Sequence, residues 1–194
     1  LRHRAVLDAR SEAIFYLCDD DLLLPEHVAD LLGLLEDHDL VQSWNGHIGA
    51  DGRMHLFPTD LSDPREVAAH LRTRPFYHRV RITGTAHTRA AYLGLDDPWG
   101  TTPPGGLGDH HQWSKFLRRN GFRGATSSRM TALQLPTSTD GRDGWSDEER
   151  LAELQRWWDL VQTPDAQRVI DEMCHEAARR ELVEIERLDE IVVG

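Results

Sequence analysis

The order of apolar and polar residues predicts an α/β chain of short strands and amphipathic helices. Residues 13–18 (AIFYLC) form an uninterrupted apolar run, which is typical of a strand covered on both faces, as in a parallel sheet. Three aspartates follow at once, and residues 25–36 then begin with Pro-Glu and continue as an amphipathic helix. The apolar positions of that helix are Val28, Leu31, Leu32 and Leu35. A strand, an acidic turn and a helix in this order make half of an α/β unit.

The rest of the chain is predicted to contain further short elements. In chain order, they are the end of a helix at residues 4–12, a hairpin around the turn at 49–52, a helix at 63–73, a strand that extends through Ile82, a short helix or turn near Arg89, a helix at 109–121, a strand at 125–135, and two charged helices within 147–189 that are separated near Pro164. The Pro/Gly-rich loop at 96–108 is too long for a simple connection, so it is a candidate for function. We therefore expect a mixed sheet with flanking helices over residues 1–145 and a helical C-terminal extension over 146–194.

Composition places the chain among globular α/β domains and excludes several classes of function. The 194 residues are 39% apolar, and no apolar segment approaches the length of a membrane span. The net charge of −11 argues against a nucleic-acid-binding surface. With only Cys18 and Cys174, we expect no disulfide framework and a cytoplasmic location.

The aspartates after the first strand, Asp19, Asp20 and Asp21, form an acidic turn that is the first candidate site. Adjacent carboxylates repel one another, and burial makes their ionised forms more costly. One interpretation is a solvated turn in which one carboxylate caps the following helix. The other is a bound cation, because ligands of open α/β sheets bind outside the carboxyl ends of the strands. Carboxylate oxygens suit Mg²⁺ or Mn²⁺, which commonly bridge one or two carboxylates to phosphate oxygens.

Two motifs, in this order, resemble those of the family 2 glycosyltransferases, which have the GT-A fold. FYLCDDDLLLPEHVADLLGLL at residues 15–35 is similar to their metal-binding motif, an apolar strand followed by aspartates, a proline and a helix. GLGDHHQWSKFLRRNGFRG at residues 106–124 is similar to their later motif, in which an acidic residue opens a helix that carries a tryptophan. Arg2 falls where such enzymes often have an Arg-Asn pair, so the resemblance covers residues 1–136.

The resemblance implies a GT-A (Rossmann-like) mixed sheet and an enzyme that transfers a sugar from a nucleotide-diphosphate donor to a hydroxyl acceptor, with inversion. The acceptor would be a glycan, a lipid or a small molecule. Asp20 and Asp21 are the implied ligands of Mn²⁺ or Mg²⁺, and Arg2 and Asp19 the implied donor-binding residues. Asp109 is the implied catalytic base, although an aspartate at the start of a helix can equally be its N-cap.

The chain also departs from the family pattern. Cys18 stands where family members often have an aspartate, and Gly108 replaces the glutamate that often precedes the later aspartate. The family's first βα units, which hold the nucleotide base, have no counterpart before Leu1. We therefore expect either a part of a longer enzyme or an incomplete donor site.

Other candidate residues carry weaker expectations. The eleven histidines include the adjacent His110 and His111, but no Cys/His group has the spacing of a structural zinc site. His87 and His110 could touch a ligand or be structural. Trp99 in the Pro/Gly-rich loop could stack on a sugar or only pack, and Arg142 is expected to reach a phosphate when its loop closes.

Two alternatives to a glycosyltransferase remain open at this point. A non-catalytic binding or scaffold domain would keep the GT-A fold without a working donor site. A metal-dependent phosphohydrolase would also use three aspartates, but it explains the helix at 109–121 less well. The charged helices at 147–189 would form a solvated cover or a partner-binding face. The partner could be a second copy of the chain, which would give a homo-oligomer.

Overall fold

The computed structural model of the protein describes residues 1–72, 80–106, 108–136 and 141–193. Along the chain the elements are α1 (Arg2–Asp8), β1 (Ala13–Phe15), β2 (Leu22–Leu23), α2 (His27–Leu35), β3 (Leu40–Gln42), β4 (Gly46–Ile48), β5 (Met54–Leu56), α3 (Pro64–Arg72), β6 (Thr85–Thr88), α4 (Arg89–Leu93), α5 (Gly108–Leu117), β7 (Gly124–Thr126), β8 (Ala132–Leu133), the 3₁₀ turn η2 (Arg142–Gly144), α6 (Asp147–Val161) and α7 (Ala166–Val193). The expected mixed α/β architecture with flanking helices is confirmed.

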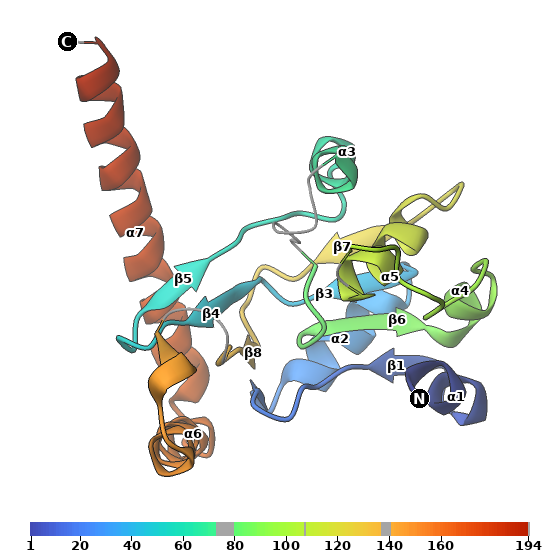
Figure 1. Ribbon diagram of the computed structural model, residues 1–194, viewed down its shortest axis with the longest axis horizontal. Coiled ribbons are helices and arrows are strands. Elements are labelled where there is room, and N and C mark those ends of the chain that lie inside the picture. The colour runs from blue at the N-terminus through green and yellow to red at the C-terminus, as the bar shows by residue number, and fades with distance from the viewer. Residues whose placement is uncertain (73–79, 107, 137–140, 194) are drawn as a thin grey trace.

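The central sheet has the strand order β1-β6-β3-β7 (Figure 1). β6 is antiparallel to both of its neighbours, with His87 opposite Ile14 on one side and Leu40 on the other. β3 and β7 are parallel. β1, β3 and β7 therefore run in the same direction, and their carboxyl ends lie at the same edge of the sheet.

Helices cover both faces of this sheet. Successive side chains of a strand point to opposite faces, so the strands contribute to two hydrophobic clusters. On one face, Leu31 and Leu35 of α2 pack against Val41 of β3 and Ala86 of β6. On the other face, Trp113 and Phe116 of α5 belong to a cluster that includes Leu40 and the α4 residue Tyr92. The prediction that the first strand is covered on both faces is confirmed, although its direct neighbour β6 is antiparallel.

A second core lies beside the sheet and contains the predicted hairpin (Figure 1). β4 and β5 pair across the turn at 49–52, and β2 pairs with β8. α7 packs on β5 with Ile170, Cys174 and Ala177, which recur at helical spacing and are buried. The two predicted charged helices are confirmed, and they supply part of a core. The domain boundary at residue 145 stays a prediction.

Several predicted boundaries are wrong. α1 ends at Asp8 because Ala9 is already extended, with ψ 138°. The strand predicted through Ile82 begins only at Thr85, since Gly84 has φ +87° and the Thr85 N–H closes a turn onto the Ile82 carbonyl. Such a left-handed residue interrupts an extended strand.

Two further predictions differ from the structure in how side chains are placed. The single strand predicted at 125–135 is divided into β7 and β8, which belong to different sheets. In α2, Val28 and Leu32 are 45% and 44% exposed, so they are not part of its inner face. That face consists of His27, Leu31 and Leu35, at four-residue spacing.

Candidate functional site

The acidic turn lies at the edge of the sheet where the carboxyl ends of β1, β3 and β7 meet, as the sequence predicts for a ligand site. The Cys18 N–H donates to the Thr83 hydroxyl at 2.9 Å, which holds the turn against the segment before β6. Asp19 is exposed, whereas Asp20 and Asp21 are half-buried. The three carboxylates therefore have different surroundings.

Asp21 points into the protein and fixes the chain after β8. Its Oδ1 accepts a hydrogen bond from the Leu135 N–H at 3.0 Å, and the Thr83 hydroxyl also bonds to this carboxylate. Burial raises the pKa of the Asp21 carboxyl, an effect that these hydrogen bonds partly offset and that the neighbouring Asp20 charge reinforces. Asp21 thus has a structural role in addition to its predicted role as a metal ligand.

Asp20 lies next to a cation that the sequence did not indicate. Nη2 of Arg150, on α6, is 3.6 Å from Asp20 Oδ2. The same guanidinium donates to Glu153 Oε2 at 2.6 Å and to the Leu135 carbonyl at 2.8 Å. Arg150 therefore brings a fixed positive charge to the acidic turn.

Arg142 does not have the role predicted for it. Its side chain is buried, and its Nε and Nη2 atoms donate to the two carboxylate oxygens of Glu153 at 2.9 and 2.5 Å. Nη2 also donates to the Gly49 carbonyl at 3.0 Å. A guanidinium with these buried partners joins α6 to the hairpin, so the prediction of a phosphate contact is wrong.

A chain of hydrogen bonds fixes Trp99 of the Pro/Gly-rich loop next to β1. The Trp99 Nε1–H donates to the Tyr16 hydroxyl at 3.2 Å, and that hydroxyl lies 2.8 Å from His87 Nε2. His87 Nδ1 lies 2.9 Å from the Thr88 carbonyl, which can only accept, so Nδ1 carries the proton and Nε2 accepts from Tyr16. Burial raises the pKa of Tyr16 to about 12 and lowers that of His87 to about 4. Both groups are neutral at pH 7.

Arg2 lies over this tryptophan. Its guanidinium carbon is 4.9 Å from the centroid of the Trp99 ring, which is cation–π geometry. Arg2 also acts electrostatically on Cys18, which directly precedes the acidic turn. Burial raises the pKa of the Cys18 thiol, and the positive charge of Arg2 partly offsets this rise. The structure thus brings Arg2 and Trp99 to the end of β1 that carries the aspartates.

Trp99 also connects the first motif to the second one. Its N–H donates to Oε1 of Gln112 at 2.6 Å, and Gln112 is buried on α5. Trp99 has φ +50°, a conformation that costs a bulky residue roughly 1–3 kcal/mol, so these contacts hold it in place. Asp109 is one helical turn before Gln112, in the first turn of α5. It is half-buried, and its Oδ1 accepts from the N–H of His110 at 3.0 Å.

The histidines named as candidates are packed inside the protein or against each other. His87 has no exposed surface, and the His110 ring stacks on that of His70, with centroids 4.6 Å apart. Within the described ranges, no group of three or more His, Cys, Asp or Glu side chains is arranged to hold a metal ion.

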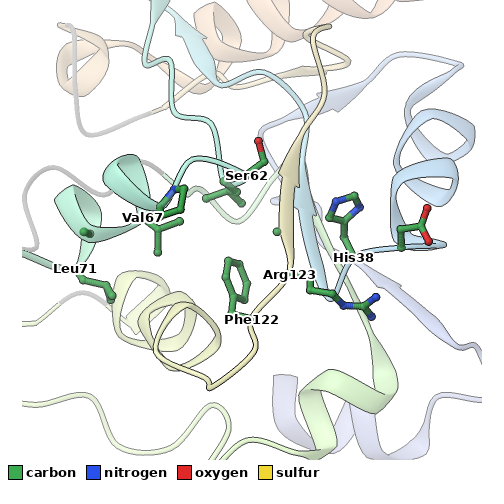
Figure 2. Close-up of a pocket in the computed structure, with 11 residues that line it drawn as sticks. His38, Ser62, Val67, Leu71, Phe122 and Arg123 are labelled. Carbon is green, nitrogen blue, oxygen red and sulfur yellow. The ribbon is translucent and has the colours of Figure 1, made fainter.

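A pocket of about 450 Å³ lies at the opposite edge of the sheet (Figure 2). Val67 and Leu71 of α3 line it together with Phe122, while His38 and Arg123 lie just before β3 and β7. These are the amino ends of the two strands. The residues predicted to carry chemistry do not line this pocket.

No family model matches the chain, and a search of curated proteins finds no match either. Among the helices of the described residues, none is long and apolar enough to cross a membrane.

Three residues of the candidate site were missed by the sequence analysis: Tyr16, Gln112 and Arg150. Tyr16 lies within an apolar run and Gln112 within a predicted helix, and neither was singled out. Arg150 had the pattern of a solvated helix face. Their contacts join segments far apart in the sequence, such as Tyr16 with Trp99, so no local pattern could have identified them.

Proposed function

We propose that the chain is a glycosyltransferase domain of the GT-A type, similar to family 2 enzymes, that moves a sugar from a nucleotide-diphosphate donor to a hydroxyl acceptor with inversion. The observation that supports this most is the position of the two acidic motifs. The acidic turn follows β1 at the ligand-binding edge of a mixed sheet, and Trp99 connects that strand to the helix that begins near Asp109.

The donor set at the acidic turn fits a hard divalent cation. Asp19 and Asp20 offer carboxylate oxygens, and Mg²⁺ commonly uses one or two carboxylates together with phosphate oxygens. A positive group, the Arg150 guanidinium, already lies against Asp20. When bound, Mn²⁺ or Mg²⁺ would stabilise the negative charge that grows on the departing diphosphate. Asp21, the other proposed ligand, is less available, because its carboxylate already bonds to the Leu135 N–H and the Thr83 hydroxyl.

Asp109 and Arg2 have the remaining roles in this proposal. The Asp109 carboxylate would take the proton from the acceptor hydroxyl while that oxygen attacks the anomeric carbon. It lies in the first turn of α5. The guanidinium of Arg2, over Trp99, would contact the donor.

The two free cysteines, Cys18 and Cys174, fit a reducing compartment, and we propose a cytoplasmic location on that ground. Association of two copies through α6 and α7 is a further proposal, for which the exposed Trp158 on α6 offers an apolar contact.

Calorimetric titration of the full-length polypeptide with UDP and GDP tests the proposal. Binding should be much tighter in Mn²⁺ than in EDTA, because the diphosphate supplies oxygens that the aspartates lack. Asp20→Asn should remove that difference while the protein stays folded. Asp165→Asn, at an exposed carboxylate of the ion pair with Arg168, is the matched control and should behave as wild type.

Equal affinity in Mn²⁺ and in EDTA would remove the metal bridge from the proposal. Absence of binding to any nucleotide diphosphate would instead favour the scaffold alternative.

A further inference from the structure

We propose that Arg150 is a diphosphate-binding residue that exchanges its contact with Asp20 for a phosphate oxygen when the donor and its cation bind. The inference rests on the proposed function and assigns the anion-binding role to a residue of α6. Arg142, the arginine that the sequence indicated, is committed to Glu153.

The Arg150 side chain is held in place from two sides. Its Nη1 donates to Glu153 Oε2 at 2.6 Å, and its Nη2 donates to the Leu135 carbonyl at 2.8 Å. The side chain is 19% exposed, compared with 58% for Arg168 on the surface of α7. A guanidinium with two such anchors loses little further conformational entropy when it binds an anion.

The contact with Asp20 is the weakest of the three. At 3.6 Å it is an ion pair longer than a hydrogen bond, and the Asp20 side chain is 36% exposed. Two of the five guanidinium N–H groups are used by Glu153 and Leu135. Nη2, the atom 3.6 Å from Asp20, carries a second N–H that neither of these two contacts with the described residues uses.

The charges explain why this contact would be exchanged. Arg142, Arg150, Glu153 and Asp20 form a connected network with two positive and two negative groups. A divalent cation on Asp20 would neutralise that carboxylate and repel Arg150. The positive charge of Arg150 would then lack its second counterion at the place where a cation-bound diphosphate supplies one.

Binding of two probes to the full-length protein tests the inference: magnesium pyrophosphate, which needs no nucleoside site, and Mn²⁺ alone. Arg150→Ala should weaken pyrophosphate binding roughly 10- to 100-fold, the value of one or two charge-assisted hydrogen bonds. The same variant should bind Mn²⁺ alone as tightly as wild type or more tightly, because Arg150 no longer competes for Asp20. A purely structural role would instead weaken both affinities together or neither.

Arg150→Lys keeps the charge and the aliphatic stem, so it tests the inference even where Arg150→Ala does not fold. It should bind pyrophosphate more weakly than wild type, because an ammonium lacks the planar fork. Arg168→Ala, at an ion-paired arginine of α7, is the control and should leave both affinities unchanged.

Wild-type affinity for pyrophosphate in both Arg150 variants would overturn the inference and leave the proposed function standing. No binding of pyrophosphate to the wild-type protein would also overturn it. The proposed function is decided separately, by the UDP and GDP titrations in Mn²⁺ and EDTA.

Discussion

At the scale of single residues, three neighbouring carboxylates have three different environments. Asp19 is exposed to water, Asp20 lies 3.6 Å from a guanidinium, and Asp21 accepts the N–H of Leu135. Solvent, a positive charge and hydrogen bonds each reduce the cost of keeping a carboxylate ionised. The repulsion within the acidic turn is therefore relieved by separate means, and Asp20 and Asp19 remain the carboxylates that a cation could reach.

Asp109→Asn separates the two roles considered for the aspartate in the first turn of α5. Asparagine keeps the shape and much of the ability to cap, so the free energy of unfolding should change by less than about 1 kcal/mol. If Asp109 is the base, donor binding should stay near normal while transfer falls roughly 10²- to 10⁴-fold. The measurements are donor affinity and transfer rate of the full-length polypeptide, once a donor and an acceptor have been found.

Asp143→Asn, at the 3₁₀ turn η2, provides a matched control outside α5 and should leave transfer unchanged. Survival of transfer within a few-fold in Asp109→Asn would leave Asp109 as a helix cap and require another base.

The lowered pKa of His87 predicts how the stability of the fold varies with pH. Burial lowers the pKa of its imidazole from 6.5 to about 4. Between these values the unfolded chain binds a proton that the folded chain does not, so the free energy of unfolding falls as the pH falls from about 6.5 to about 4. The full contribution is roughly 3 kcal/mol.

Urea unfolding at several pH values between 7 and 4 measures this dependence. His87→Gln should give a shallower dependence than wild type, whatever its absolute stability. His55→Gln, at an exposed histidine of β5, should keep the wild-type slope. An unchanged slope in His87→Gln would mean that other groups, such as the buried His27, whose pKa is also lowered, determine the acid response.

At the scale of elements, the predictions from the sequence were most accurate where a strong hydrophobic pattern is bounded by residues that typically begin or end a helix or a strand. The helix with Trp113 and Phe116 inward, the hairpin at 49–52 and the two C-terminal helices all have such patterns, and all are present. Residues 125–135 look like one strand because they include several apolar and β-branched residues and neither Gly nor Pro marks a break. Only the tertiary structure shows that the Ser127 N–H pairs with Gln42 in one sheet, whereas Leu133 pairs with Leu22 in another.

The candidate site was predictable only as far as its residues are local. The acidic turn and Asp109 are recognisable because strand, turn and helix signals surround them. The contacts that position them join distant segments: Trp99 with Tyr16, and Arg150 with Asp20. Burial and the approach of α6 decide these pairings, and neither can be read from a local pattern.

At the scale of the whole molecule, one buried ion-pair network holds the second core to the acidic turn. Glu153 of α6 accepts from both Arg142 and Arg150, and its side chain is 3% exposed. Arg142 continues to the hairpin through the Gly49 carbonyl, and Arg150 continues to Asp20. The C-terminal helices are therefore connected to the candidate site by charge as well as by apolar packing.

Because two guanidiniums share Glu153, its loss should cost more than the loss of either arginine. Glu153→Gln leaves two cations without their common counterion, and we expect the free energy of unfolding to fall by about 3–5 kcal/mol. Arg142→Met keeps the Glu153–Arg150 pair and should cost less, about 1–3 kcal/mol. Glu172→Gln, at a 64% exposed carboxylate of α7, should cost under about 0.5 kcal/mol. Urea denaturation of the three variants measures this order, and a cost for Glu153→Gln no greater than for Glu172→Gln would show that the network does not hold α6 in place. If the chain binds a nucleotide diphosphate as proposed, that binding should weaken in Glu153→Gln as well, because Arg150 then loses the anchor that places it beside Asp20.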